Sequence, residues 1–183
     1  MTRNEAIKLL ARRDLARLSE EKREALLLDW WYIDADDPEY DGLPDLLKSM
    51  MASFDVPEDP TRSIYDPLLQ IALEYSYIGV VNTYLKSQTQ LLGCEEAIEG
   101  DVEDLKACSC CGYRSLLEGG SYEICRVCFW EDDGTTECDR ISAPNHMTLR
   151  EARINFQRSG AVSDAYRQNV LPDGKDRYVS TIP

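Results

Sequence analysis

The sequence predicts a mostly α-helical chain that carries a small β-hairpin in its C-terminal part. Capping residues followed by apolar residues at helical spacing recur up to Gly93 and again after Thr148. Five of the seven cysteines fall within Cys108–Cys128, in two Cys-x-x-Cys pairs that flank short strand-like segments. We therefore expect a helical part over residues 1–100, packed on a cysteine-rich part over residues 101–183.

Capping signals mark the helices at the N-terminus. Thr2-x-x-Glu5 has the pattern of a capping box, in which a hydroxyl and a carboxylate each cover a free amide at a helix start. Ser19, followed by two glutamates, starts a second helix that runs through Ile33. Residues 44–54 predict a short helix beginning at Pro44.

The longest predicted helix covers residues 67–92. Asp66 is its expected cap, Pro67 suits its first turn, and Gly93 suits its stop. Polar residues interrupt its apolar run, so a buried central helix fits better than a membrane span. Its apolar stripe consists of Leu68, Ile71, Tyr75, Ile78, Val81 and Leu85.

An acidic stretch follows the second predicted helix. The formal net charge of the chain is -14, and residues 29–66 hold eleven acids against Lys48 and Arg62. Residues 34–42, DADDPEYDG, read as an exposed loop that contains Pro38 and Gly42. Such a surface repels phosphate backbones and attracts basic partners. The alternative is that the acids only keep the protein in solution.

The two cysteine pairs have the spacing of metal ligands. Cys108-x-x-Cys111 and Cys125-x-x-Cys128 are separated by thirteen residues. Each tight turn aims two sulfurs at one ion, and four thiolates complete a closed tetrahedral zinc site. An odd cysteine count argues against a disulfide framework, and a redox motif normally uses one pair in a βαβ unit. We therefore expect these four cysteines to bind a structural zinc ion.

A hairpin between the pairs is predicted to bring them together. Residues 113–117 and 122–124 read as strands joined at Gly119-Gly120, which places Cys111 opposite Cys128. Gly112 follows the first pair at a point where the turn often needs a positive φ.

The remaining thiols and the only histidine are secondary candidates. Cys110 is an alternative to Cys111 as a ligand, but a buried thiol beside the site is the preferred interpretation. Cys94 and Cys138 lack partners at ligand spacing, and four cysteines leave no need for His146 as ligand or base. Thr148-x-x-Glu151 then starts a helix that ends at Gly160.

Three segments in this part resemble a known family. CSCCGY, SYEICRVCFWEDDG and APNHMTLREARINFQRSGA together are similar to the cysteine-rich CPCC family of small bacterial domains, over residues 105–165. Ser109 and Arg126 stand where that family often has proline, but every expected ligand is present. Family members often occur beside bacterial polymorphic toxins. The resemblance therefore implies an immunity protein, which binds a toxin made by its own cell and blocks it.

These observations favour a toxin-neutralising immunity protein that acts by occlusion. An acidic inhibitor suits a cognate toxin with a basic nucleic-acid- or nucleotide-binding cleft. Trp30 and Trp31 would be anchors for the partner or part of the core. The candidate contact residues are Asp34, Asp36, Asp37, Glu39, Tyr40 and Asp41.

The alternative is a zinc-ribbon nucleic-acid-binding or adaptor protein. Arg150, Arg153 and Arg158 share one predicted helix, but residues 101–183 still have ten basic residues against fourteen acids. No nucleophile or phosphate-loop motif points to an enzyme or a small-molecule substrate. The first residues have no apolar leader, so we expect a cytoplasmic protein without a membrane partner.

Overall fold

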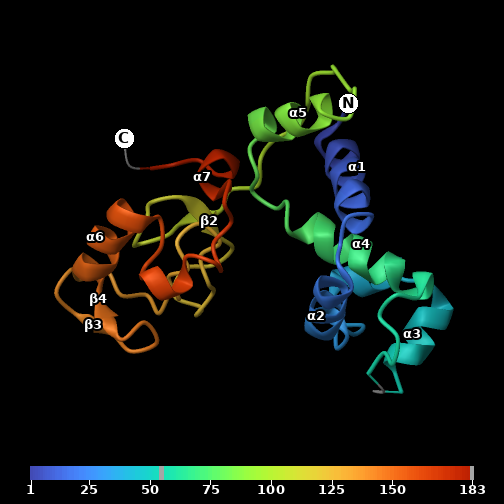
Figure 1. The fold of residues 1–183 in the computed structure, drawn as a ribbon, viewed down its shortest axis with the longest axis horizontal. Helices are drawn as coiled ribbons and strands as arrows, with labels where there is room; N and C mark the ends of the chain where they lie inside the picture. The colour runs from blue at the N-terminus through green and yellow to red at the C-terminus, as the bar shows by residue number, and fades with distance from the viewer. Residues whose placement is uncertain (54–55, 182–183) are drawn as a thin grey trace. The chain divides into compact units, whose positions relative to one another are not determined.

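The computed structural model describes residues 1–53 and 56–181. In these residues the chain is mostly helical, with two short antiparallel strand pairs near its C-terminal half, which confirms the predicted fold class (Figure 1). The chain divides into two compact units. The N-terminal unit comprises Met1–Ile78 and Leu85–Gly100, and the C-terminal unit comprises Gly79–Tyr84 and Asp101–Pro183.

The first two helices begin at the predicted caps. Helix α1 (Arg3–Leu15) has Thr2 as its N-cap, and the capping box with Glu5 is complete. Helix α2 (Glu20–Trp30) starts after Ser19, whose hydroxyl accepts the amide of Lys22 at 3.3 Å. Both helices contact α4 (Asp66–Tyr75), which therefore organises the N-terminal unit (Figure 1).

The acidic stretch contains more regular structure than a loop. A 3₁₀ turn, η1 (Pro38–Gly42), precedes α3 (Asp45–Met51), and a second one, η2 (Ser63–Tyr65), precedes α4. Phe54, the last residue of the predicted short helix, lies outside the described residues. The core beneath these elements is formed by Leu27, Trp31, Leu43, Leu47, Met51, Tyr65, Leu68 and Leu69.

The prediction of one helix over residues 67–92 is wrong. The structure has two helices there, α4 and α5 (Asn82–Gln90), with a turn between them. Gly79 in this turn has a φ of +73°, and a Cβ at this position would lie 2.1 Å from Cδ1 of Leu105. The chain bends because a residue without a side chain lets Leu105 approach the backbone. Gly93 follows α5 with a φ of +82°.

The C-terminal unit contains short strands and helices around the cysteines. Strand β1 (Lys106–Ala107) pairs with β2 (Arg114–Leu116), and β3 (Ile141–Ser142) pairs with β4 (Met147–Thr148). Helix α6 (Leu149–Ser159) starts at the predicted capping box and ends at Gly160, which has a φ of +81°. A 3₁₀ turn, η3 (Asp164–Tyr166), and a short helix, α7 (Gly174–Arg177), follow.

The predicted pairing of residues 113–117 with residues 122–124 is wrong. Lys106 pairs with Leu116 in the first hairpin, whereas Ile124 forms a bridge with Glu131. Each Cys-x-x-Cys pair therefore occupies the turn of its own hairpin. Each turn presents two sulfurs and also closes its own hairpin. The two cysteine pairs therefore do not depend on a strand pairing between residues 113–117 and 122–124.

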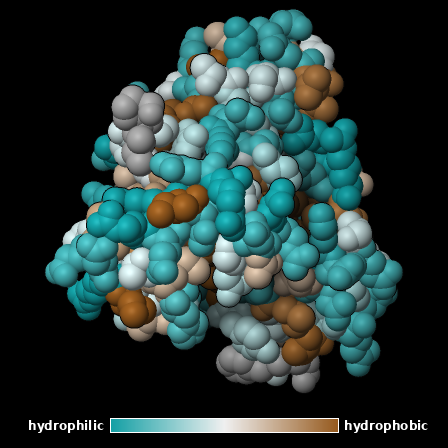
Figure 2. All heavy atoms as spheres, turned by 60° about the vertical axis from the view of Figure 1, so that its left-hand side comes forward, coloured by the Kyte–Doolittle hydropathy of each residue, from teal (hydrophilic) through white to brown (hydrophobic). Residues whose placement is uncertain are grey.

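Helix length bears on the question of a membrane span. Among the described residues, no helix combines the length and the apolarity that crossing a membrane requires. The face shown in Figure 2 is largely hydrophilic, and its hydrophobic residues form small separate patches.

Candidate metal centre

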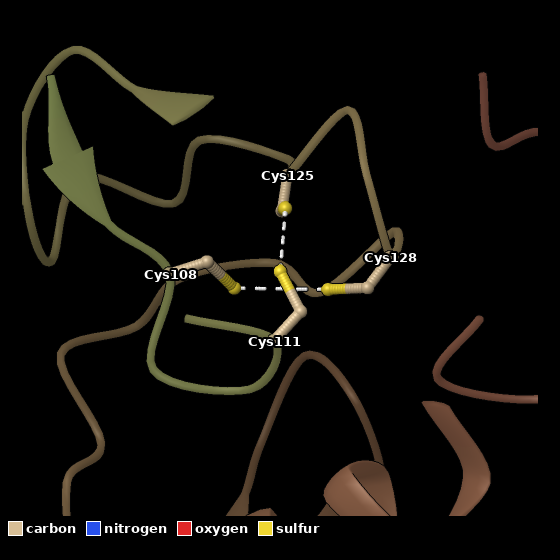
Figure 3. Close-up of side chains that lie close together, drawn as sticks. All are labelled: Cys108, Cys111, Cys125 and Cys128. Atoms are coloured by element: carbon tan, nitrogen blue, oxygen red, sulfur yellow. Dashed lines mark hydrogen bonds between the residues drawn. The ribbon is translucent and has the colours of Figure 1, made fainter. Parts of the chain in front are cut away.

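Four buried sulfurs come together between the two hairpin turns. The Sγ atoms of Cys108, Cys111, Cys125 and Cys128 all lie within 4.8 Å of one another (Figure 3). The sulfurs of Cys108 and Cys128 are 3.6 Å apart, as are those of Cys111 and Cys125. The structure thus brings together the four cysteines that their spacing singled out.

The sulfur separations fit ligands of one ion rather than disulfides. A disulfide has an S–S distance of about 2.05 Å, whereas all four cysteines here are free thiols. Four sulfurs at about 2.3 Å from a tetrahedral ion lie about 3.8 Å from one another. The closest observed separations of 3.6 Å are near that value. The donor set therefore fits a metal ion held by four thiolates.

Backbone hydrogen bonds shape the first turn. The amide of Gly112 donates to the carbonyl of Cys108 at 2.8 Å, and the amide of Cys108 donates to the carbonyl of Tyr113 at 2.9 Å. Gly112 has a φ of +75°, as its place after the first pair predicts. Its carbonyl accepts the amide and the hydroxyl of Thr181, which fixes the turn from outside.

The second turn repeats this geometry with different residues. The amide of Phe129 donates to the carbonyl of Cys125 at 2.8 Å, and the amide of Cys125 donates to the carbonyl of Trp130 at 2.8 Å. Phe129 has a φ of +67°, although it is not a glycine. Its ring stacks on Tyr166 with the centroids 4.8 Å apart. The unit therefore contains the same turn twice.

Crowding of the four thiols perturbs their pKa values in opposite directions. Hydrogen bonding with Cys111 raises the pKa of Cys108, and burial followed by contact with Cys108 raises that of Cys128. Burial also raises the pKa of Cys125, but hydrogen bonds from the neighbouring thiols and from Ser115 lower it well below its ordinary value. A dication among the sulfurs would stabilise all four as thiolates.

Two supporting residues have no signal in the sequence. The hydroxyl of Ser115 lies 3.1 Å from Sγ of Cys125. Arg153 on α6 donates from Nε and Nη2 to the carbonyl of Ser109, at 3.1 and 2.9 Å. The sequence indicated only that Arg153 shares a predicted helix with Arg150 and Arg158. Its link to a turn 44 residues away depends on tertiary structure.

The other candidate ligands lie outside the four-sulfur group. Cys110 is 2% exposed, so it is a buried thiol, as the preferred interpretation states. Cys94 and Cys138 are half-buried free thiols, and Cys138 lies 3.4 Å from Nη1 of Arg153. His146 is exposed and belongs to no metal-binding group within the described residues.

The candidate partner-binding residues lie in the N-terminal unit. Asp34, Asp36 and Asp41 are exposed, whereas the other three are half-buried. Tyr40 packs against the hydrophobic core, so only part of its ring faces solvent. The amide of Asp36 donates to the carboxylate of Asp34 at 2.9 Å. Local hydrogen bonds therefore order this segment without neutralising its charge.

Fold and site together define a small module in which two cysteine turns bring four sulfurs together in an arrangement that fits one metal ion. Residues 106–176 match the model of the family described as cysteine-rich CPCC, so the C-terminal part of the chain belongs to that family. Comparison with curated proteins and with solved structures gave no match.

Proposed function

We propose that the ion is zinc and that it is structural. Zinc accepts four thiolates in a closed tetrahedral site, and such sites contribute directly to folding. The sulfurs are buried, and four protein ligands leave no position for a substrate or an activated water. Strands β1 and β2 contain only five residues between them, so the ion would hold this part of the unit together.

We further propose that the chain is an immunity protein that binds and neutralises a cognate bacterial toxin. The observation that carries this proposal is the unpaired acidic segment of the N-terminal unit. Residues 29–45 contain seven carboxylates, and none has an ion-pair partner among the described residues. A surface of this kind favours a basic protein partner and speeds its association.

Neutralisation would occur by occlusion of the toxin's basic cleft. Toxins that act on nucleic acids or nucleotides bind polyanions, so an acidic protein competes for the same positive surface. The chain would need no reaction of its own, which agrees with a fully ligated metal site. The proposal places the protein in the cytoplasm, where its seven free thiols would stay reduced.

The nucleic-acid-binding alternative receives less support from the arginines of α6. Arg150 pairs with Asp139, and Arg158 pairs with Asp164. Arg153 donates to the carbonyl of Ser109. These cations are therefore already engaged within the unit. A gel-shift assay at low salt tests the alternative, and clear binding of DNA or RNA would favour it over the immunity function.

The immunity function is tested with the protein encoded beside this chain's gene. We expect that protein to stop growth when expressed alone and to be neutralised when this chain is coexpressed. The triple variant Asp34→Asn, Asp36→Asn, Asp41→Asn should bind it at least about tenfold more weakly and with a smaller salt dependence.

A matched control variant neutralises the same number of carboxylates at other positions. Glu24→Gln, Glu58→Gln and Asp101→Asn remove three exposed carboxylates outside the segment. This control should bind nearly as tightly as the wild type at physiological salt. If the neighbouring gene product is harmless, or is harmful and unaffected by this chain, the proposed function is wrong.

A further inference from the structure

The acidic segment borders a cavity of about 200 Å³ in the N-terminal unit. It forms where the C-terminal ends of α2 and α3 meet η1, and Tyr32 beside it is 58% exposed. Its volume is ample for a side chain, since a cavity of only about 10–15 Å³ holds a water molecule. The cavity is lined by Trp31, Tyr32, Ile33, Asp34, Tyr40, Met51 and Ala52.

Two helix ends give the cavity a negative potential. Helix α2 ends at Trp30 with Trp31 as its C-cap, and its last turn contains no basic residue. Helix α3 ends at Met51 with Ala52 as its C-cap, and its last turn contains Lys48. The C-terminus of a helix carries a partial negative charge and favours cations. Trp31, Met51 and Ala52 all line the cavity, so both helix ends border it, and the end of α2 has no basic residue to offset its charge.

A full negative charge adds to these partial charges. Asp34 lines the cavity, is exposed, and has no ion-pair partner among the described residues. Over residues 29–52 there are seven carboxylates against the single cation of Lys48. The Nζ atom of Lys48 donates to the main-chain carbonyl of Asp41 rather than to a carboxylate. The segment therefore favours a cation supplied by another molecule.

The walls of the cavity suit the body of a long basic side chain. Trp31, Tyr32 and Tyr40 supply aromatic rings, which attract cations through their faces. Lys48 holds its ammonium 5.1 Å from the centroid of Tyr40, so Trp31 and Tyr32 are the rings left for an incoming cation. Ile33 and Met51 supply apolar surface for a methylene stem.

Trp31 offers a reporter for the cavity. Its side chain lines the cavity and is 1% exposed, and its Nε1–H has no acceptor among the described residues.

We propose that this cavity is the anchor site for one arginine or lysine side chain of the partner protein. The cation lies against Asp34 and the aromatic rings, and its stem packs on Ile33 and Met51. This inference rests on the proposed function, because it names the group of the toxin that the acidic segment receives. It also says where that group binds, whereas the charge of the segment alone would attract any basic surface.

Nuclear magnetic resonance of the full chain tests the site without a toxin. Trp30, Trp31 and Trp130 give three indole N–H signals, which single Trp→Phe variants assign. The probes are the blocked peptide Gly-Arg-Gly and its citrulline analogue, together with Gly-Lys-Gly and its norleucine analogue. The basic peptides should shift the Trp31 signal saturably at millimolar concentrations and leave the Trp130 signal unchanged. The uncharged analogues should bind at least about threefold more weakly.

A variant pair locates the charge that matters. Asp34→Asn should weaken binding of the basic peptides about three- to fivefold, the loss expected for one partly exposed ion pair. Glu58→Gln removes an equal charge elsewhere in the unit and should leave the affinity unchanged. Equal binding of the charged and uncharged peptides would overturn the inference in favour of an apolar groove. An unchanged affinity in Asp34→Asn, or no shift of Trp31, would also overturn it.

Failure of this inference differs from failure of the proposed function. If the basic peptides bind at Trp31 but the neighbouring gene product is not neutralised, the site stands and the immunity function falls. If the gene product is neutralised but is bound equally tightly by wild type and Asp34→Asn, the immunity function stands and the anchor site falls.

Discussion

Gly112 and Phe129 occupy the same position in the two cysteine turns, and both have a positive φ, of +75° and +67°. In each turn this residue donates its amide to the carbonyl of the first cysteine, Cys108 or Cys125, at 2.8 Å. The conformation costs a residue with a side chain about 1 kcal/mol relative to glycine. In the second turn, the stacking of Phe129 on Tyr166 offsets part of this cost.

At both positions, glycine should therefore give a more stable protein than alanine. Gly112→Ala should lower the free energy of unfolding by about 1 kcal/mol, and Phe129→Ala should be less stable than Phe129→Gly by a similar amount. The second comparison removes the ring from both variants, so only the backbone differs. Denaturant unfolding in a fixed excess of zinc measures the free energy of unfolding of each variant. Equal stability of alanine and glycine at either position would show that the turn is not held in this conformation.

Arg153 should stabilise the first turn from α6. Arg153→Met leaves the half-buried carbonyl of Ser109 without its two hydrogen bonds, which should cost about 1–3 kcal/mol. Arg158→Met on the same helix breaks only an exposed pair with Asp164 and should cost less than about 1 kcal/mol. Unfolding curves of both variants give the comparison. Equal losses would mean that Arg153 does not support the turn.

Gly79 should tolerate a side chain less well than Gly93. Both have a positive φ, so alanine adds backbone strain of about 1 kcal/mol at either position. At Gly79 the new Cβ would also lie 2.1 Å from Cδ1 of Leu105, whereas at Gly93 it meets nothing within 4 Å. Gly79→Ala should therefore be the more destabilising change by at least about 1 kcal/mol. Similar melting temperatures for the two variants would contradict this account of the break between α4 and α5.

The capping box of α1 predicts a pH dependence in the N-terminal unit. The backbone amide and then the hydroxyl of Thr2 donate to Glu5 and lower the pKa of its carboxyl group. A lowered folded-state pKa contributes stability above the unfolded pKa of about 4.3, and this stability is lost as the pH falls through the folded value. A side-chain NMR titration should give a pKa for Glu5 below 4.3, and Thr2→Ala should raise it. An identical titration in that variant would rule out a contribution from the hydroxyl of Thr2.

Local signals allowed much of this structure to be predicted from the sequence. The two-residue spacing in Cys108-x-x-Cys111 and Cys125-x-x-Cys128 identified the four sulfurs that come together, because each turn is a local structure. The capping boxes at Thr2 and Thr148 located two helix starts for the same reason. Each of these features depends on residues within five positions of one another.

The features that sequence reasoning missed depend on distant contacts. The break at Gly79 is tied to Leu105, and the first cysteine turn is tied to Arg153, with no local pattern joining either pair. The strand pairing was wrong because Gly119-Gly120 resembled a hairpin turn. In the structure the carboxylate of Glu123 accepts the amide of Leu117 at 2.6 Å and replaces a strand ladder there.

Removal of one ligand should unfold the C-terminal unit. Cys125→Ser leaves three thiolates, and apparent zinc-binding free energies in small metal-folded peptides reach roughly 10–16 kcal/mol. Cys94→Ser changes a half-buried thiol outside the cluster and should leave the unit folded. Circular dichroism and fluorescence of Trp130 follow the loss. Coincident melting curves for the wild type and Cys125→Ser would contradict the structural role of the site.

The central claim is that four thiolates hold one zinc ion, and metal analysis of the purified protein tests it most directly. Protein prepared without chelators should contain about one zinc per chain, released by a thiol-modifying reagent as the four cysteines react. A zinc content below about half an ion per chain in protein that is folded and has reduced cysteines would contradict the claim.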